Sequence, residues 1–218
     1  MISCPDWNQD RPGDIGRIVE NIKALSPLIE GDATTRPTPS LAIALEWHGR
    51  IYEGVAVPHR DYVGQVRDSD ARFPCLIDYE VAVGTARGIR ARDVPAALDA
   101  FVRSTATVVS TLDAVVPAGV VPAAPPIVAA IVRLCAYAHG EWIRIHPFAN
   151  GNGRTARIWA NWIAVRYGLP PFVRIKPRPE DVLFAGAAEL SMRGDHRPTE
   201  VMFAMMLDDA IRAAMGRP

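Results

Sequence analysis

The chain has 218 residues, of which 49% are hydrophobic, and its 24 Lys and Arg side chains balance 24 Asp and Glu side chains. This length is typical of a single domain, and the hydrophobic share suffices for a continuous core, so general disorder is excluded. A net charge of zero argues against a protein that coats nucleic acid or an anionic membrane, since both require a basic excess. We therefore expect a globular protein with neither nucleic acid nor a membrane as its partner, although a local basic pocket is not excluded.

Helical spacing of apolar residues begins near the N-terminus. Apolar side chains recur at helical intervals over residues 15–25, with Asp14 in position to cap the helix. The pair Ser26-Pro27 predicts an interruption, followed over residues 28–31 by a short helical turn that ends at a glycine. Residues 32–40 are rich in Thr, Pro and Asp, which indicates a linker.

The stretch over residues 50–88 differs from the rest of the chain. Glycines and prolines bracket short runs rich in Val, Ile and Tyr, which predicts a hairpin or a loop excursion. Helical spacing predicts further helices over residues 41–47, 93–116, from 125 onward, 154–167, 180–192 and 199–215. No alternation of strands with helices suggests a parallel sheet, so the predicted fold class is all-α with a small β excursion.

Two features bear on compartment. Residues 114–132 carry no charge over a length that can span a bilayer, but four prolines and a glycine within them exclude a continuous helix. The three cysteines are widely spaced and lack a Cys-x-x-Cys pair, so neither a disulfide framework nor a zinc ribbon is expected, and a reducing compartment fits best. The N-terminus lacks the basic and apolar regions of a signal peptide. We therefore expect a cytoplasmic protein.

Residues 146–157, with the sequence HPFANGNGRTAR, combine groups that bind phosphate. Two glycines separated by one residue allow a tight turn whose backbone N–H groups face a common point, and the turn opens into a helix whose N-terminus attracts anions. Arg154 and Arg157 share one face of that helix and suit a polyphosphate. His146 lies just before the turn, close enough to act as a base on a nucleophile that approaches the bound phosphorus. The segment fits neither the dinucleotide fingerprint nor the P-loop.

This run resembles the Fic family signature, His-x-Phe-x-Asp/Glu-Gly-Asn-Gly-Arg-x-x-Arg. The resemblance covers roughly residues 40–215 and implies an all-α, Fic-like helical bundle with a β-hairpin flap. It also implies an activity, the transfer of AMP from ATP to a Ser, Thr or Tyr hydroxyl of a target protein, possible targets including tyrosines of the chain itself. ATP and a protein that presents a hydroxyl side chain are therefore the implied partners.

The resemblance assigns roles to residues of the signature. His146 would deprotonate the target hydroxyl. Arg154 would neutralise charge on the α- and β-phosphates, and Arg157 would hold the γ-phosphate. The anion hole for the α- and β-phosphates would be formed by Gly151, Asn152 and Gly153.

Asn150 departs from the family pattern, which has a carboxylate here that binds Mg²⁺. An amide oxygen can still ligate Mg²⁺ but brings no negative charge, so we expect weaker binding, with ATP phosphates supplying most of the ligands. Reduced turnover, a different nucleotide and an altered transfer chemistry stay open. A nucleotide-binding regulatory module with little catalysis is the alternative from another functional class. The related death-on-curing toxins, which phosphorylate their target, carry Lys near the position of Gly153.

A second resemblance lies near the N-terminus. Residues 26–31 fit the family's inhibitory pattern Ser/Thr-x-x-x-Glu-Gly/Asn. It implies that the carboxylate of Glu30, oriented by Ser26, pairs with Arg157 in the place of the γ-phosphate. We therefore divide the chain into an N-terminal segment with an inhibitory helix over residues 1–40 and a Fic-like catalytic domain over residues 41–218.

Two further patterns are shorter. Residues 61–67 resemble the start of the family's Gly-x-x-Arg flap, which would bind the target segment by strand addition through Gly64, Gln65, Val66 and Arg67. The family's adenine pocket would align with Phe184 and Asp195. A homodimer is possible, and the sequence does not identify the target protein.

Overall fold

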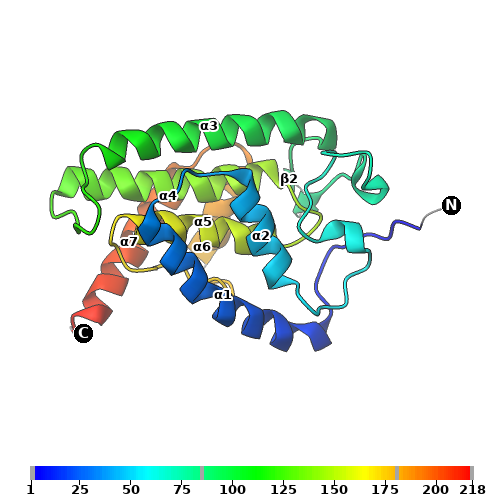
Figure 1. The fold of residues 1–218 in the computed structure, drawn as a ribbon, viewed down its shortest axis with the longest axis horizontal. Helices are drawn as coiled ribbons and strands as arrows, with labels where there is room; N and C mark the ends of the chain where they lie inside the picture. Colours follow the sequence, from blue (N-terminus) through cyan, green and yellow to red (C-terminus); the bar gives the residue numbers. More distant parts are fainter. Residues whose placement is uncertain (1–2, 84–85, 180–181, 217–218) are drawn as a thin grey trace.

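The computed structural model describes residues 3–83, 86–179 and 182–216, which form seven α-helices and one short β-hairpin (Figure 1). The expected all-α class with a small β excursion is confirmed. The helices are α1 (Ile15–Thr35), α2 (Leu41–Ile51), α3 (Val94–Asp113), α4 (Pro125–Ile145), α5 (Asn152–Arg166), α6 (Val182–Met192) and α7 (Arg197–Ala214). The hairpin pairs β1 (Ala82–Val83) antiparallel with β2 (Ala86–Arg87).

Helix α4 is the centre of the bundle. It contacts α3, α5, α6 and α7, and α3 lies along its length in Figure 1. Its first turn opens on Pro125-Pro126, where missing N–H groups remove no helical hydrogen bond. Trp142 of α4 and Trp159 and Trp162 of α5 are fully buried, so these tryptophans pack the core. The two helices therefore hold the segment between them, residues 146–151, against the core.

Helix α1 corrects the predicted break at Ser26-Pro27. The helix is continuous through Pro27, and Ser26 donates its hydroxyl to the carbonyl of Ile22 at 2.9 Å instead of capping a new helix. A proline inside a helix costs about 3 kcal/mol because it removes one hydrogen bond and crowds the preceding turn. The apolar stripe of α1 continues past it, with Ile29 and Ala33 buried against the core, and this packing offsets the cost.

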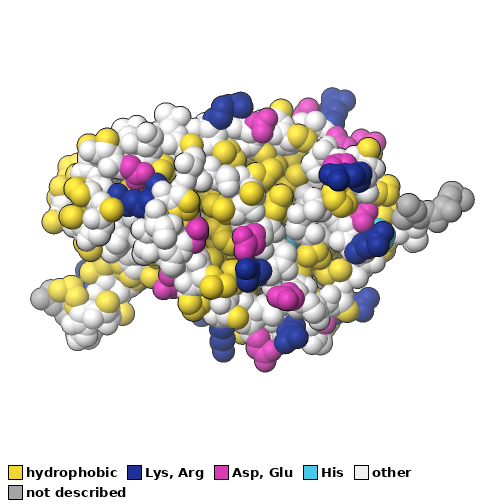
Figure 2. Space-filling view, viewed as in Figure 1, with side chains coloured by type: hydrophobic (Ala, Val, Ile, Leu, Met, Phe, Trp, Pro, Cys, Tyr) yellow, Lys and Arg dark blue, Asp and Glu magenta, His cyan; other side chains and the backbone are white. Residues whose placement is uncertain are grey.

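The uncharged stretch after α3 is a connection, as predicted. Residues 114–124 join α3 to α4, and α4 begins at Pro125. Within the part of the chain that the structure describes, every helix is too short or too polar to cross a bilayer. On the face shown in Figure 2, charges of both signs are interspersed among apolar side chains.

A disulfide joins the N-terminal segment to the long excursion between α2 and α3. Cys4 and Cys75 are bonded although 71 positions separate them, whereas Cys135 is a free, buried thiol. The expectation of unpaired cysteines is therefore wrong for one pair. An odd number of widely spaced cysteines carries no local signal of such a bond, because folding alone brings the two chain segments together.

Candidate active site

His146 ends helix α4 in the left-handed conformation, with φ 53°, and its ring is fixed by the preceding turn. Its Nδ1–H donates to the carbonyl of Ile143 at 3.0 Å, and among the described residues Nε2 has no hydrogen-bond partner, so it can accept a proton. Burial lowers the pKa of His146 to about 4, with the charge of Arg67 acting in the same direction. The imidazole is therefore neutral near pH 7.

The turn after His146 is held by Asn152. The backbone N–H of Phe148 donates to Asn152 Oδ1 at 2.9 Å, and Asn152 Nδ2 donates to the carbonyl of Phe148 at 2.8 Å. The phenyl ring is fully buried and stacks on His48, with ring centroids 3.9 Å apart. The side chain of Asn152 thus fixes the shape of the turn, so its contribution to an anion hole falls to its backbone.

Gly151 adopts a φ of +82° at the tightest point of this turn. A Cβ there would lie 3.0 Å from His48 Nε2 and from Tyr52, so both the backbone conformation and the space require glycine. The next two residues begin α5, and no acceptor in the described chain takes the N–H groups of Asn152 and Gly153. Two backbone donors are therefore available to an anion at this helix N-terminus.

Both arginines of the signature are held in the turn's vicinity rather than in bulk solvent. Arg157 is 7% exposed and donates through Nε and Nη2 to the carbonyl of Ile175, at 3.0 and 2.8 Å. Burial lowers the pKa of Arg157 to about 9, and the positive charges of Arg154 and Arg178 add to this shift. A dianionic or more highly charged ligand would relieve the repulsion between these cations.

Arg154 pairs with Asp10, a residue outside every sequence pattern considered above. Its guanidinium binds both carboxylate oxygens of Asp10, and it also donates to the hydroxyl of Tyr52. Lys176 Nζ lies 3.7 Å from Asp10 Oδ2, and Asn150 Nδ2 donates to Asp10 Oδ1 at 3.2 Å. Burial alone would raise the pKa of Asp10, but the hydrogen bonds and charge of Arg154 hold it below its usual value. An internal carboxylate therefore occupies the side-chain part of the anion site, at Arg154, and leaves the N–H groups of Asn152 and Gly153 without an acceptor among the described residues.

His48 supports the signature turn from α2, a role that no sequence motif indicated. Gly64 donates its N–H to His48 Nδ1 at 2.9 Å, so Nε2 carries the proton and donates to the carbonyl of Asn150 at 3.0 Å. Burial lowers the pKa of His48 to about 3, which keeps the ring neutral. His48 thereby links the excursion after α2 to the signature turn.

Ser26 and Glu30 lie near the site without contacting its arginines. Both line a cavity of about 270 Å³ between α1 and α5, which Lys176 also borders. Glu30 is exposed, and within the described residues no ion pair joins it to Arg157. The structure thus does not bring together the expected Glu30–Arg157 pair.

The residues expected to start the flap lie outside the β-hairpin of the structure. The strands of the hairpin lie at residues 82–83 and 86–87, whereas Gly64, Gln65 and Val66 belong to a loop packed beside His48 and the core. Arg67 is fully buried, and its guanidinium donates to the carbonyls of Tyr79, Ile89, Ile145 and His146. The hairpin thus lies within the excursion predicted over residues 50–88, whereas Arg67 binds the end of α4 from within the protein, and a role of Gly64–Arg67 in target binding stays a prediction.

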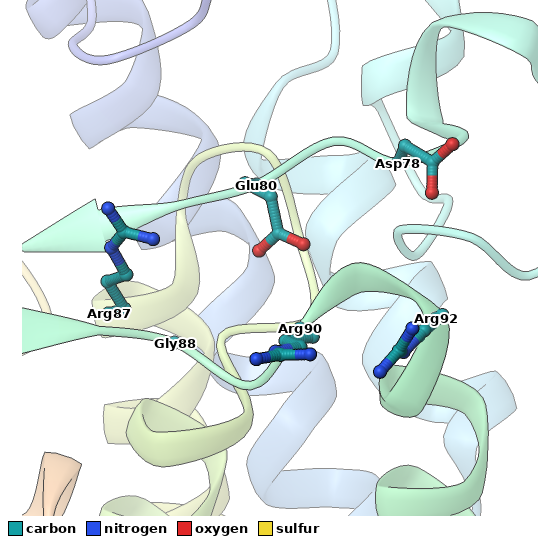
Figure 3. Close-up of a pocket in the computed structure, with 6 residues that line it drawn as sticks. All are labelled: Asp78, Glu80, Arg87, Gly88, Arg90 and Arg92. Atoms are coloured by element: carbon teal, nitrogen blue, oxygen red, sulfur yellow. The ribbon is translucent and has the colours of Figure 1, made fainter.

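The hairpin itself adjoins His146. A Cβ added at Gly88 would lie 2.9 Å from Cβ of His146, and Ile89 donates its N–H to the carbonyl of Arg144 at 3.2 Å. Beside it lies a cavity of about 520 Å³ (Figure 3). Its lining combines Asp78, Glu80, Arg87, Gly88, Arg90 and Arg92. The hairpin thus lies beside His146.

The two residues expected in the adenine pocket face different surroundings. Phe184 of α6 is buried edge-on against His139, with ring centroids 5.8 Å apart. Asp195 lies between α6 and α7, pairs with Arg197 and lines a separate surface cavity. The structure does not join them in one pocket.

The turn offers few ligands for Mg²⁺. The Oδ1 of Asn150 accepts the N–H of Gly151 at 2.6 Å, and the one carboxylate beside it, Asp10, is paired with Arg154 and near Lys176. Mg²⁺ prefers carboxylate and phosphate oxygens, and flanking cations oppose it. The chain's own residues therefore do not fit a resident magnesium ion.

The protein is a helical bundle in which His146 and a glycine turn join the central helices α4 and α5, and two arginines are buried beside that turn. Other proteins share this combination of fold and site. The family model described as Fic/DOC family matches residues 38–164, and the chain belongs to this family. Relatives named "Protein adenylyltransferase Fic" from Drosophila persimilis and Drosophila melanogaster are 40% and 39% identical to it over 67 residues. Each match spans 31% of this chain and 13% of the relative.

Solved structures share the fold. A Fic domain containing signaling protein from Bacteroides thetaiotaomicron aligns with a TM-score of 0.61 and 19% identity, covering 92% of this chain and 73% of that one. Fic-1 from C. elegans aligns with a TM-score of 0.60 and 22% identity, covering 91% and 49%. BepC from Bartonella tribocorum, solved with bound AMPPNP, aligns with a TM-score of 0.56 and 13% identity, covering 88% and 86%. The Fic-like bundle is thereby confirmed.

Proposed function

We propose that this chain is a nucleotidyltransferase that moves AMP from ATP to a Ser, Thr or Tyr hydroxyl of a target protein. The observation that carries the proposal is the arrangement at the N-terminus of α5. Two backbone N–H groups and two buried arginines lie there, close in the chain to His146, and within the described ranges neither those N–H groups nor Nε2 of His146 has a partner. The relatives named protein adenylyltransferase and the AMPPNP in BepC support the choice of nucleotide.

The chain's residues account for each step of the transfer. The N–H groups of Asn152 and Gly153, with Arg154, would bind the α- and β-phosphates, and Arg157 the γ-phosphate. His146 Nε2 would accept the proton of the target hydroxyl as its oxygen bonds to the α-phosphorus. The bond from that phosphorus to the oxygen bridging to the β-phosphate breaks, and pyrophosphate leaves. Bound phosphates raise the low pKa of His146 and so strengthen it as a base.

Two other contacts complete the proposal. Because the turn itself does not fit Mg²⁺, the ion would arrive bound to the phosphate oxygens of ATP, with at most the amide oxygen of Asn150 added. The target segment would align with the β1–β2 hairpin beside His146, where strand addition places a hydroxyl near the base. A cytoplasmic location and a homodimer stay predictions, as does the inhibitory role of Glu30.

A nucleotide-binding module with little catalysis is the second candidate. It is favoured by Asn150, which lacks the family's charge, and by Asp10, which is paired with Arg154 of the anion site. Such a module would bind ATP and transfer nothing. Phosphorylation of the target, as in death-on-curing toxins, is a third outcome that the same experiment separates.

The test uses the Asp10→Ala protein, in which the anion site is open, with Asp10→Ala/His146→Ala as its control. Each protein is incubated with a cell lysate and with ATP labelled at either the α- or the γ-phosphate. Protein bands labelled only from α-labelled ATP, and lost in the control, support AMP transfer. Label from γ-labelled ATP alone indicates phosphorylation, and no label despite ATP binding indicates the binding module. Mass spectrometry of labelled peptides identifies the added group and the target.

A further inference from the structure

The N-terminal segment, residues 3–10, crosses the protein as a strap that ends at the anion site. Cys4 is bonded to Cys75, and Tyr62 donates its hydroxyl to the carbonyl of Pro5 at 2.6 Å. Trp7 is 4% exposed, and its ring contacts those of Tyr52, Tyr62 and His48. The backbone N–H of Trp7 donates to the hydroxyl of Tyr79 at 2.8 Å. A segment without helix or strand is thus fixed at several points.

The last residue of the strap is surrounded by groups suited to a phosphate. Asp10 accepts hydrogen bonds from Arg154, Asn150 and Tyr52, and Lys176 lies within ion-pair distance. Lys176 belongs to no sequence pattern, yet its side chain is only 20% exposed and faces the same carboxylate. Because a phosphate group is larger and more highly charged than a carboxylate, the two cannot share this position.

We propose that Arg154, Lys176 and Asn150 form a phosphate subsite, that Asp10 fills it from within, and that the Cys4–Cys75 disulfide holds Asp10 there. Lys176 is thereby assigned as a further phosphate-binding residue. The proposal rests on the proposed function in naming ATP as the ligand that Asp10 excludes. It differs from the Glu30 pattern because the carboxylate belongs to Asp10, its partner is Arg154 rather than Arg157, and a disulfide holds it in place.

The disulfide matters because it keeps Asp10 at a high effective concentration beside Arg154. Reduction by a dithiol supplies two electrons and two protons, converts the bond into the thiols of Cys4 and Cys75, and leaves the reductant as its own disulfide. The strap then depends on Trp7 and two hydrogen bonds, and its open fraction rises. Apparent affinity for a competing ligand rises in proportion to that fraction.

The experiment measures binding rather than transfer, so it does not depend on catalysis. Isothermal titration calorimetry gives the Kd of ATP and of inorganic tripolyphosphate for oxidised wild type, wild type with dithiothreitol, Cys4→Ser and Asp10→Ala. Asp6→Ala is the matched control, because Asp6 is an exposed carboxylate of the same strap. Asp10→Ala/Lys176→Met tests the assigned lysine in the open site. Non-reducing peptide mapping shows whether Cys4 and Cys75 are bonded.

We expect Asp10→Ala to bind both ligands at least about tenfold more tightly than oxidised wild type, with Asp6→Ala matching wild type. Reduction or Cys4→Ser should move wild type toward the Asp10→Ala value, while Asp10→Ala itself should not respond to the dithiol. Lys176→Met in the Asp10→Ala background should weaken tripolyphosphate binding about tenfold.

Equal affinities of oxidised wild type and Asp10→Ala would overturn the proposal, as would the failure of Asp10→Ala to bind tripolyphosphate. A difference between them that reduction does not alter, or free thiols at Cys4 and Cys75 in the native protein, would overturn the role of the disulfide. Tight, redox-dependent binding without transfer would support this inference and count against the transferase.

Discussion

Asn150 and Asp10 are joined by a hydrogen bond of 3.2 Å that an ionised acid at residue 150 could not make, because Nδ2 donates to Oδ1 of the carboxylate. The two residues are 140 positions apart in the chain. An acid at position 150, as the family pattern has, would place two carboxylates in contact. The amide of Asn150 therefore allows Asp10, at the end of the strap, to lie beside it.

Asn150→Asp is expected to displace Asp10 and to create a magnesium ligand at the same time. Like charges in contact repel, and a carboxylate beside phosphates is a preferred Mg²⁺ ligand. ATP affinity, compared by calorimetry, should rise about tenfold more in Mg²⁺ than in EDTA, because the new carboxylate binds the ion but repels phosphates that carry no metal. The isosteric Asn21→Asp, at an amide that binds backbone carbonyls of α2's end, is the control. An increase that persists fully in EDTA would contradict the metal part.

Gly151→Ala should disrupt the turn. A left-handed φ costs an L-residue about 1–2 kcal/mol, and the new Cβ would press on His48 and Tyr52, so we expect a loss of at least about 2 kcal/mol in unfolding free energy. ATP binding should weaken with it. Gly186→Ala is the matched control, because that glycine lies within α6 with nothing within 4 Å of the added Cβ. The control should stabilise the protein by up to about 1 kcal/mol in urea unfolding.

Arg67→Met separates a structural role from a role in target binding. The substitution leaves carbonyls at the end of α4 and in the excursion without their donor, in a fully buried position. We expect a loss of about 3 kcal/mol or more in unfolding free energy, against less than about 0.5 kcal/mol for the exposed Arg72→Met. Unchanged stability with lost target labelling would favour the flap assignment instead.

The sequence patterns predicted those helices and turns whose formation depends on residues close together in the chain. The apolar spacing of α3, α4, α5 and α7 and the glycine turn after His146 follow from residues close in sequence, and the structure contains them. Pro27 predicts a break because the free-energy cost of a proline in a helix depends on its own turn alone. The packing of Ile29 and Ala33 that offsets this cost involves residues distant in the sequence.

The contacts that the sequence did not predict join distant segments. Asp10 lies 144 positions from Arg154, and the bonded cysteines are 71 apart. The hairpin strands have two residues each, too few for any period to show. The residues around Arg67 resemble the start of a flap, but its burial depends on carbonyls at the end of α4, which no pattern near residue 67 indicates.

Three buried histidines predict a loss of stability in mild acid. Burial lowers the pKa of His48 and of His139 to about 3, and that of His146 to about 4. An unfolded histidine titrates near ~6.5, so as the pH falls below this value the unfolded chain gains protons that the folded protein does not take up. Unfolding free energy should decrease between pH 6.5 and 5, at up to about 1.4 kcal/mol per pH unit for each histidine.

His139→Phe provides the check on this slope. Among the residues that the structure describes, neither ring nitrogen of His139 has a hydrogen-bond partner, so the substitution leaves no donor or acceptor of these residues unpaired. Urea unfolding at several pH values should show about two thirds of the wild-type slope, with stability at pH 7.5 equal or higher. A slope identical to that of wild type would show that His139 is protonated in the folded protein.

Glu30→Gln tests the inhibitory pattern against the contacts that the structure contains. The guanidinium of Arg157 donates to the carbonyl of Ile175, and Glu30 is exposed on α1, so Glu30 does not occupy the position proposed for the γ-phosphate. We therefore expect Glu30→Gln to change the Kd of ATP by less than about threefold, in wild type and in Asp10→Ala, because only long-range charge is removed. Glu20→Gln, also exposed on α1, is the matched control. Since glutamine keeps the helix propensity of glutamate, a tightening well beyond threefold in the Asp10→Ala background alone would mean that Glu30 reaches Arg157 once the strap has left.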